Sequence, residues 1–418
     1  MIDLCNTQPG ALLTLPEALA KIKAAISPID DPEIVVLNNA AGRMLSDPVY
    51  SPINIPYDNN ASMDGYAFSS SDIEPEKAFS LKLAGTSWAG RPFTDTLKPG
   101  YCIRVFTGAV VPPETDSVIM QEQVRTEETT IHFPAQVKAH QNIRFAGEDI
   151  QQGGLLLAPP KKLSVYDLGL LAAAGVNAIK VKRKIKIAFF STGDELTAVG
   201  QALQPGKIYD SNRYLLIEFL KEASYLVTDM GVIADNKQWL QESLINAAKE
   251  HDVIITTGGA SVGEADYVQE ILADCGQVNF WKLAIKPGKP LAFGSIGRCH
   301  FFGLPGNPVA VAVTFQQLVA PALKQLSGAP KNKALRLTAT STCRLKKTQG
   351  RLEFQRGILT QDDSGVFFVT SAGHQGSHIL GSMSAANCFI LLPAECDGLN
   401  IGDKVLVEPF GVELPSNP

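Results

Sequence analysis

The chain has 418 residues, of which 45% are hydrophobic and 19% charged, and its formal net charge is -5. This length exceeds one ordinary hydrophobic core, so several domains are expected, and the composition is that of a folded globular protein. The negative charge argues against a nucleic-acid binder, and no apolar stretch is long enough to predict a membrane span.

The cysteines predict a reducing, cytoplasmic location. There are seven, an odd number, and no two form a Cys-x-x-Cys pair. Scattered cysteines of this kind are typical of free thiols rather than of disulfides or zinc sites. The first residues show no basic stretch followed by an apolar run, so no secretory signal is expected.

Two helices are marked by their N-terminal capping patterns. Thr14 and Glu17 begin the first, and the apolar positions that follow fall on one face: Leu15, Leu19, Ile22 and Ile26. Ser164 and Asp167 begin the second, which is expected over 164–174 and ends before a glycine.

The region between these helices predicts a small all-β domain. From about residue 78 to 158, short extended runs such as FSLKLAG, YCIRVFTG and TIHFPAQV alternate with turns. Segments 1–50 and 152–182 are similar mixed pieces on either side of it. We therefore expect them to form one elongated domain, from which residues 51–151 project as a β-rich insert.

The sequence from 183 to 331 predicts a doubly wound α/β domain. Strand-like runs alternate with helix-like ones, which is typical of a parallel sheet with helices on both faces. The expected strands are 185–190, 226–233, 252–257, 278–284, 289–296 and 300–304, and the expected helices are 212–223, 237–249, one ending near 274 and one starting at 307. Residues 332–418 contain only strand-like runs and predict a C-terminal barrel or sandwich.

Polar and glycine residues follow the predicted strands of the α/β domain. Because ligands of open α/β sheets bind beyond the carboxyl ends of the strands, these residues are expected to gather on one rim of the sheet. They are Ser191, Gly193, Glu195, Asp235, Gly258, Gly259, Ser261, Gly263, Asp266, Lys282 and Lys286.

Three kinds of chemistry are expected at this rim. The glycine-rich loop TTGGASVG suits an anionic group, although turns use Gly and Ser freely. Glu195 and Asp266 suit Mg²⁺, which prefers oxygen ligands, although carboxylates also cap helices. Lys282 and Lys286 suit an oxyanion, although their stems can equally lie along the surface.

Several polar residues outside the rim have ordinary structural explanations. Asp64 and Asp149 lie in turns with glycine nearby. His374 and His378 are interpreted as structural, because Gly376 between them argues against the helix that a two-histidine metal motif requires. Arg356 and Ser377 are candidate oxyanion contacts on polarity alone.

Ten motifs, in this order, resemble the molybdopterin molybdenumtransferase family, whose animal relative is the E domain of gephyrin. The resemblance extends from about residue 10 to 410. The motifs are MDGYA, IRVFTGAVVP, NIRFAGEDI, STGDEL, IYDSN, TTGGASVGEADY, FWKLAIKPGKPLAFG, GLPGNPVA, LEFQRG and GHQGSHI.

The resemblance implies a four-domain, elongated subunit that forms a homodimer, in which the β-rich insert of one subunit faces the α/β domain of its partner. It further implies molybdenum insertion into adenylylated molybdopterin with release of AMP; the metal cofactor expected from the rim carboxylates is Mg²⁺. The other substrate is molybdate, and contacts with the adenylyltransferase and with acceptor molybdoenzymes are expected. Two alternatives stay open: an adenylyltransferase, and a gephyrin-like scaffold that binds partners.

The resemblance also assigns residues to these roles. It implies metal or catalytic roles for Glu195 and Asp266, and a shared site in which the partner subunit contributes the insert. The remaining functional acids are Asp64, Asp149 and Asp235, the turn near the cleft contains Thr107, and the oxyanion pocket contains Lys282, Lys286, Arg356 and Ser377.

Overall fold

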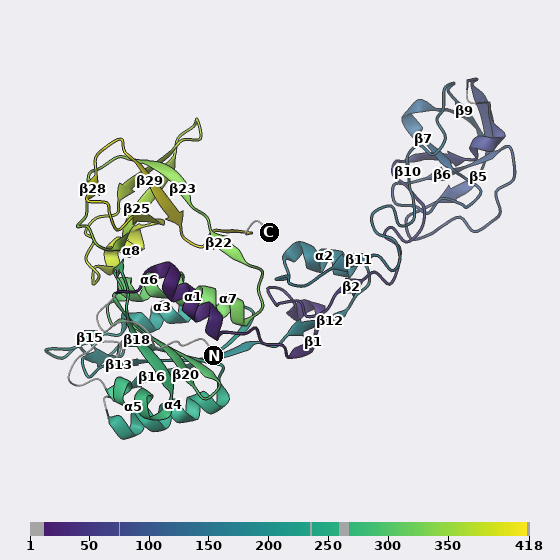
Figure 1. The fold of residues 1–418 in the computed structure, drawn as a ribbon. Helices are drawn as coiled ribbons and strands as arrows, with labels where there is room; N and C mark the ends of the chain where they lie inside the picture. The colour runs from purple at the N-terminus through teal and green to yellow at the C-terminus, as the bar shows by residue number, and fades with distance from the viewer. Residues whose placement is uncertain (1–11, 75, 235, 259–266, 416–418) are drawn as a thin grey trace.

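The computed structural model describes residues 12–74, 76–234, 236–258 and 267–415. The molecule is elongated (Figure 1): a β-rich insert lies at one end, a small mixed domain follows, and the α/β domain and the C-terminal barrel lie together at the other end. The predicted class, a doubly wound α/β domain with a β-rich insert and a C-terminal β-barrel, is confirmed.

The α/β domain is built on a six-stranded sheet with the order β16-β13-β17-β21-β20-β18. Its strands are β13 (Ile185–Thr192), β16 (Tyr225–Ile233), β17 (Val253–Thr257), β18 (Gln277–Lys282), β20 (Pro290–Ile296) and β21 (Cys299–Leu304). The prediction of an all-parallel sheet is wrong for β20, which is antiparallel to both neighbours. The connection from β20 to β21 is a tight turn at Gly297, and parallel neighbours would need a long crossover.

Helices cover both faces of this sheet (Figure 1), as predicted. On one face lie α4 (Lys237–Glu250) and α5 (Tyr267–Cys275), and on the other lie α3 (Ser211–Phe219), α6 (Pro308–Thr314), the π-helical turn η4 (Phe315–Val319) and α7 (Ala320–Leu326). Strand β13 explains both layers: Ile187 and Phe189 pack into one core, and Ala188 and Phe190 into the other. Helix α3 ends at Phe219, four residues before its predicted end at Ala223.

Helix α1 (Leu15–Ala25) begins with the predicted capping box, in which the Thr14 hydroxyl accepts from the Glu17 amide and the Glu17 carboxylate accepts from the Thr14 amide. The structure places this helix differently from the expected grouping of residues 1–50 with 152–182. Ala18 and Ile22 are fully buried in the core of the α/β domain. The apolar face of α1 is buried there because η4 and α7 pack beside it.

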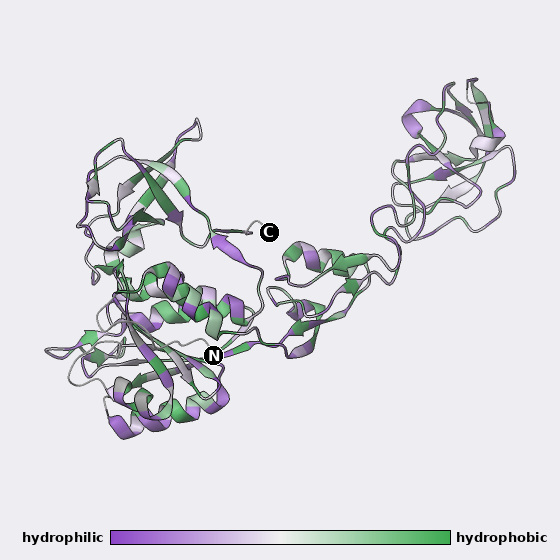
Figure 2. Cartoon of the chain, in the orientation of Figure 1, coloured by the Kyte–Doolittle hydropathy of each residue, from purple (hydrophilic) through white to green (hydrophobic). Residues whose placement is uncertain are grey.

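The mixed domain is held together by two antiparallel strand pairs. They join β1 (Pro32–Val36) to β12 (Ala178–Lys182) and β2 (Val49–Tyr50) to β11 (Leu155–Leu157). Helix α2 (Val165–Ala173) completes this domain and carries the predicted Ser164–Asp167 capping box. Figure 2 shows that α2 is largely hydrophobic, yet Val165 and Tyr166 are 71% and 86% exposed.

The β-rich insert contains a six-stranded sheet with the order β7-β4-β6-β5-β9-β8. Its strands are β4 (Gly65–Phe68), β5 (Phe79–Ser87), β6 (Tyr101–Val105), β7 (Ser117–Met120), β8 (Arg125–Glu127) and β9 (Thr130–Phe133); the pair β3 (Asn60–Ala61) and β10 (Ile143–Arg144) adjoins it. A Cβ atom on Gly65 would lie 1.9 Å from the Ile119 carbonyl oxygen. Only glycine therefore allows β4 and β7 to approach this closely.

The C-terminal domain is a closed five-stranded barrel with the order β25-β26-β23-β29-β27, closed by β25–β27 pairing. The strands are β23 (Leu337–Ser341), β25 (Leu352–Gln361), β26 (Phe367–Ser371), β27 (Cys388–Leu392) and β29 (Lys404–Pro409). The prediction that this region contains only strands is wrong, because α8 (Leu380–Ala385) lies within it. Its sequence, LGSMSA, has no helical apolar periodicity.

Several short strand pairs complete the domains. β19 (Ile285–Lys286) leaves the α/β domain and pairs with β25 of the barrel. The remaining short pairs are β14 (Leu196–Thr197) with β15 (Ile208–Tyr209), β22 (Asn332–Ala334) with β30 (Glu413–Pro415), and β24 (Leu345–Lys346) with β28 (Gly398–Leu399). Within the described residues, no helix is long and apolar enough to cross a membrane.

Candidate active site

The carboxyl ends of β13 and β17 lie side by side in the sheet, as the rim prediction requires. Ser191 and Thr257 are paired in register, and their buried hydroxyl oxygens are 3.1 Å apart. Ser191 is fully buried. Its hydroxyl therefore joins the two strand ends and does not reach the surface.

Glycine is required where the backbone leaves these strands. Gly258 has a φ of +87°, and a Cβ atom there would lie 2.5 Å from the Thr192 carbonyl oxygen. Gly193 has a φ of +145°, and its Cβ position would collide with the Glu195 carboxylate. Close packing of this kind brings the Glu195 side chain back against the backbone that follows β13.

Five of the predicted rim residues lie outside the described part of the chain. They are Asp235, Gly259, Ser261, Gly263 and Asp266. Glu195 is exposed at the end of β13, and it is the only proposed metal ligand that the described ranges include. Within those ranges, no group of three His, Cys, Asp or Glu residues is placed to hold a metal ion.

A cavity of about 940 Å³ lies between the rim of the α/β domain and the barrel. One wall contains Gly258, the 286–290 turn and the Pro305-Gly306-Asn307 loop, and the other contains barrel residues from β24, β25 and the 371–377 loop. Its charged lining residues are Lys286, Lys289, Arg344, Lys346, Arg351 and Glu353. With five cations and one carboxylate among the described lining residues, this part of the cavity is strongly positive although the chain as a whole is negative.

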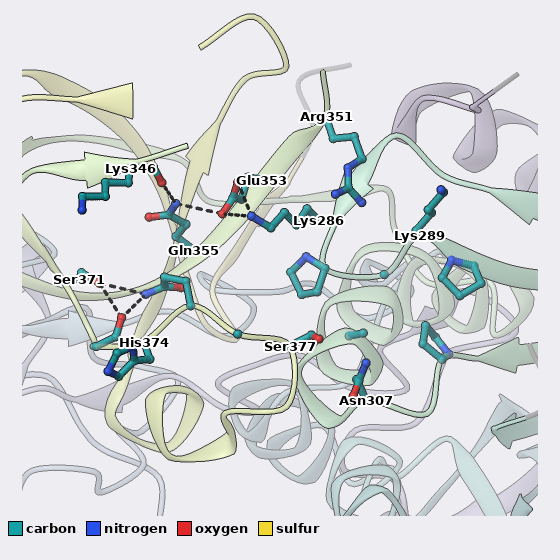
Figure 3. Close-up of a pocket in the computed structure, with 18 of the residues that line it drawn as sticks. Lys286, Lys289, Asn307, Lys346, Arg351, Glu353, Gln355, Ser371, His374 and Ser377 are labelled. Atoms are coloured by element: carbon teal, nitrogen blue, oxygen red, sulfur yellow. Dashed lines mark hydrogen bonds and ion pairs between the residues drawn. The ribbon is translucent and has the colours of Figure 1, made fainter. Parts of the chain in front are cut away.

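Lys286 is oriented by the Glu353 carboxylate (Figure 3). Its Nζ lies 3.3 Å from both oxygens of Glu353, which is almost fully buried. Gln355 donates to Glu353 Oε1 at 3.0 Å and to the Lys346 carbonyl at 2.8 Å. The Lys286 side chain remains 45% exposed, so its ammonium group stays accessible from the cavity.

Arg356 does not lie where an oxyanion contact would. It is 1% exposed and is not part of the cavity wall. Its guanidinium donates to the carbonyls of His374 and Gly376, both at 2.9 Å, and to the Ser382 hydroxyl at 3.1 Å. Burial lowers the pKa of Arg356 to about 10, which still leaves it charged at neutral pH. The sequence could not distinguish this buried role from a ligand contact.

Arg356 instead fixes the loop that carries Ser377 into the cavity. The Ser377 carbonyl accepts from the Val309 amide at 3.2 Å, which joins the loop to the start of α6. Figure 3 shows Ser377 and Asn307 near each other on this side of the cavity. His374 and His378 are exposed and lie in an irregular segment, as the intervening glycine predicted.

Lys282 lies at the carboxyl end of β18, opposite Pro290. It is exposed and does not line the cavity. Helix α1 approaches this point, because the Leu13 amide donates to the Lys282 carbonyl at 2.8 Å. Of the two lysines expected in the oxyanion pocket, the structure therefore brings Lys286 to the cavity and leaves Lys282 beside it.

Asp64 and Thr107 are in direct contact in the β-rich insert. Asp64 Oδ1 accepts from the Thr107 amide and from the Thr107 hydroxyl, both at 2.8 Å. These hydrogen bonds, that of the amide first, hold the pKa of Asp64 below its usual value. Asp149 is exposed, and its amide donates to the Ile55 carbonyl at 3.1 Å. Figure 1 shows the insert at the opposite end of the molecule from the α/β domain and the barrel, whose residues line the cavity.

Three cationic residues of the cavity were missed in the sequence: Arg344, Lys346 and Arg351. They belong to the run RLKKTQGR, which looks like an ordinary solvated turn between two strands. The barrel closure turns this segment toward the α/β domain. No local pattern signals that arrangement.

Three family models match successive parts of the chain. They describe the MoeA N-terminal region (domain I and II) over residues 13–175, a probable molybdopterin binding domain over 188–325, and the MoeA C-terminal region (domain IV) over 338–410. An elongated protein with an α/β molybdopterin-binding fold, a β-rich insert and a C-terminal barrel is the class that these models and the structure define.

Known relatives extend over nearly the whole chain. A molybdopterin molybdenumtransferase from Haemophilus influenzae is 42% identical over 96% of this chain and 99% of its own length. One from Nostoc is 35% identical over 90% and 88%. A crystal structure of the molybdopterin biosynthesis moeA protein from Pyrococcus horikoshii has a TM-score of 0.80 at 30% identity, covering 96% and 100%. The chain belongs to the molybdopterin molybdenumtransferase family.

Proposed function

We propose that this protein is a molybdotransferase of molybdenum cofactor biosynthesis, which transfers molybdenum from molybdate to adenylylated molybdopterin and releases AMP. The names of its relatives support the general activity. The observation that carries the specific proposal is the cavity between the α/β domain and the barrel, whose described lining has five cationic side chains and one carboxylate.

The charge of the cavity suits a reaction between two anions. Molybdate and a substrate with several phosphate groups repel one another, by roughly 4 kcal/mol for two unit charges 4 Å apart near a protein surface. Lys286 and Lys289 come from the α/β side and Arg344, Lys346 and Arg351 from the barrel side. Fixed cations on both walls offset this repulsion without reorganising during the reaction.

Each wall has a distinct task in this proposal. Lys286 and Ser377 bind molybdate, Arg356 holds the Ser377 loop in place, and Lys282 attracts anions toward the rim. The loop that begins at Gly258 binds the adenylylated substrate, so that its phosphoanhydride lies beside the molybdate site. Cleavage of the anhydride by water or by a molybdate oxygen releases AMP, and molybdenum becomes bonded to the two dithiolene sulfurs with loss of one of its oxygens. Where water attacks the anhydride, that oxygen leaves as water with the two thiol protons; where the molybdate oxygen attacks, it leaves in AMP and the thiol protons pass to solvent.

Mg²⁺ is the proposed cofactor, held by Glu195 and Asp266. The carboxylate oxygens of Glu195, exposed at the end of β13, suit a hard divalent cation. The ion neutralises phosphate charge when bound. Asp235 is proposed as a further functional acid of the rim. Replacement of Asp266 by Asn is expected to abolish metal-dependent AMP release, and retained release would remove this residue from the metal role.

We further propose that the active site is shared between two subunits of a homodimer in the cytoplasm. The mixed domain exposes apolar side chains that a partner would cover: Ile34, Val36, Val165 and Tyr166 are 56–86% exposed. In such a dimer, Asp64, Thr107 and Asp149 would reach the partner's rim. Mixed dimers of Asp64→Ala and Asp266→Ala chains test this arrangement: recovered activity supports a shared site, and no recovery contradicts it.

The decisive experiment measures AMP release from adenylylated molybdopterin with Mg²⁺, with and without molybdate. Molybdate-stimulated release, and a product that activates a molybdenum-free apoenzyme, are expected. Lys286→Gln should lower the stimulated rate at least about tenfold, and Lys249→Gln, an exposed lysine of α4, is the matched control. ATP consumption with molybdopterin alone would instead support an adenylyltransferase, and no release under any metal would support a scaffold.

A further inference from the structure

The β-rich insert presents a tryptophan ring on a rigid support. Trp88 follows β5 and forms a tight backbone pair with Arg91, with hydrogen bonds of 3.0 and 2.9 Å between their amides and carbonyls. The Trp88 ring stacks on Phe106, with ring centroids 4.1 Å apart and an interplanar angle of 13°. This spacing leaves no room for another ring between them, yet Trp88 remains 52% exposed.

Arg104 lies over the rings of Phe106 and Tyr66. Its guanidinium carbon lies 5.2 Å from the centroid of Phe106 and 5.8 Å from that of Tyr66. The guanidinium also donates to Gln121 Oε1 at 3.0 Å and to the Tyr66 hydroxyl at 3.4 Å. These contacts fix the guanidinium, which in turn fixes Phe106 and hence the plane of Trp88.

Hydrogen-bonding groups lie immediately beside this stack. Phe106 is followed by Thr107, whose amide and hydroxyl both donate to Asp64 Oδ1 at 2.8 Å. The pKa of Asp64 is held low mainly by the Thr107 amide and also by the charge of Arg104. Thr107, the next residue after Phe106, thus connects the planar, preoriented apolar stack to an ionised carboxylate, which is a hydrogen-bond acceptor for ring N–H and exocyclic amino groups.

We propose that Trp88 is a stacking platform for a planar nitrogen heteroaromatic ring, whose N–H or amino edge points toward Asp64. Aromatic side chains bind such rings through their faces, and a ring held in place loses little entropy on binding. The inference rests on the proposed function, because adenylylated molybdopterin contains two rings of this class, the pterin and the adenine. It adds a binding residue that no motif of the family resemblance singled out.

Equilibrium dialysis of two probes, neopterin and AMP, against the full-length protein tests the platform and identifies the ring. Trp88→Leu removes the aromatic face and keeps apolar cover over Phe106. Trp88→Phe retains a smaller face. Trp239→Leu is the matched control, because Trp239 is 61% exposed on α4 in a different domain. Circular dichroism and the thermal midpoint verify that each variant is folded.

For at least one probe, the dissociation constant is expected to be about tenfold higher for Trp88→Leu than for the native protein. For Trp88→Phe it should lie within about threefold of the native value, and for Trp239→Leu it should be unchanged. Weakening for neopterin assigns the pterin, and weakening for AMP assigns the adenine. Equal binding of both probes to the native protein and Trp88→Leu overturns the inference, as does no binding of either probe at ~1 mM.

The AMP-release assay on the same preparations separates this inference from the proposed function. Molybdate-stimulated release without Trp88-dependent binding overturns the platform alone. Trp88-dependent binding without any AMP release retains the platform and overturns the molybdotransferase proposal.

Discussion

Replacement of Arg356 by Lys is expected to loosen the loop that carries Ser377. Arg356 is 1% exposed and makes three hydrogen bonds, to two carbonyls of the loop and to Ser382 of α8. A lysine ammonium retains the charge but lacks the planar fork, so it satisfies fewer of these acceptors. Each carbonyl left buried without a partner costs about 1–3 kcal/mol.

We therefore expect Arg356→Lys to lower the free energy of local opening by about 3 kcal/mol. That loss corresponds to an increase of roughly 100-fold in the hydrogen-exchange rate of loop amides. Exchange of residues 372–379, followed by mass spectrometry, measures this effect. The concentration of molybdate that half-saturates AMP release should rise with it, because Ser377 is no longer held in place.

Arg351→Lys is the matched control, because Arg351 directly precedes β25, the strand that contains Arg356. Arg351 is half-buried and donates one long hydrogen bond, 3.3 Å, to the Ile285 carbonyl. Its replacement should change local stability by less than about 1 kcal/mol. Exchange protection in Arg356→Lys that matches the native protein would refute the assignment of Arg356 as the support of the loop.

Three further outcomes are expected. Lys286→Met leaves the buried Glu353 carboxylate without its ion-pair partner, so it should lower the thermal midpoint as well as the affinity for molybdate. The double replacement of Lys286 by Met and Glu353 by Leu should recover the thermal midpoint but not the affinity. Thr107→Val removes the hydroxyl but not the amide donor, so the pKa of Asp64 should rise only part of the way toward its usual 3.8 in an NMR titration. Because the folded-state pKa is depressed, the stabilisation that Asp64 provides exists above its unfolded pKa and is lost as pH falls through the folded value. An unchanged pKa of Asp64 in this variant would contradict this account. Gly65→Ala should prevent the insert from folding, and a native-like NMR spectrum of the insert would show that the 1.9 Å approach can relax.

Local patterns in the sequence determined most of the secondary structure. Both capping boxes, at Thr14 and at Ser164, are present because they depend only on residues three positions apart. The apolar run along β13 was sufficient to predict a buried strand, and the alternation of strand-like with helix-like runs predicted helices on both faces of the sheet. Glycine at position 258 was recognisable because a backbone turn at a strand end requires a positive φ.

Only the tertiary structure decided which residues meet. Helix α1 belongs to the α/β core, and not to the neighbouring domain, because its apolar face found partners about 300 residues later in the chain, at η4 and α7. The barrel closure brought Arg344, Lys346 and Arg351 to the cavity and turned Arg356 into the interior. The sequence shows that a side chain is cationic, whereas burial and partners determine whether that charge binds a ligand or holds the protein together.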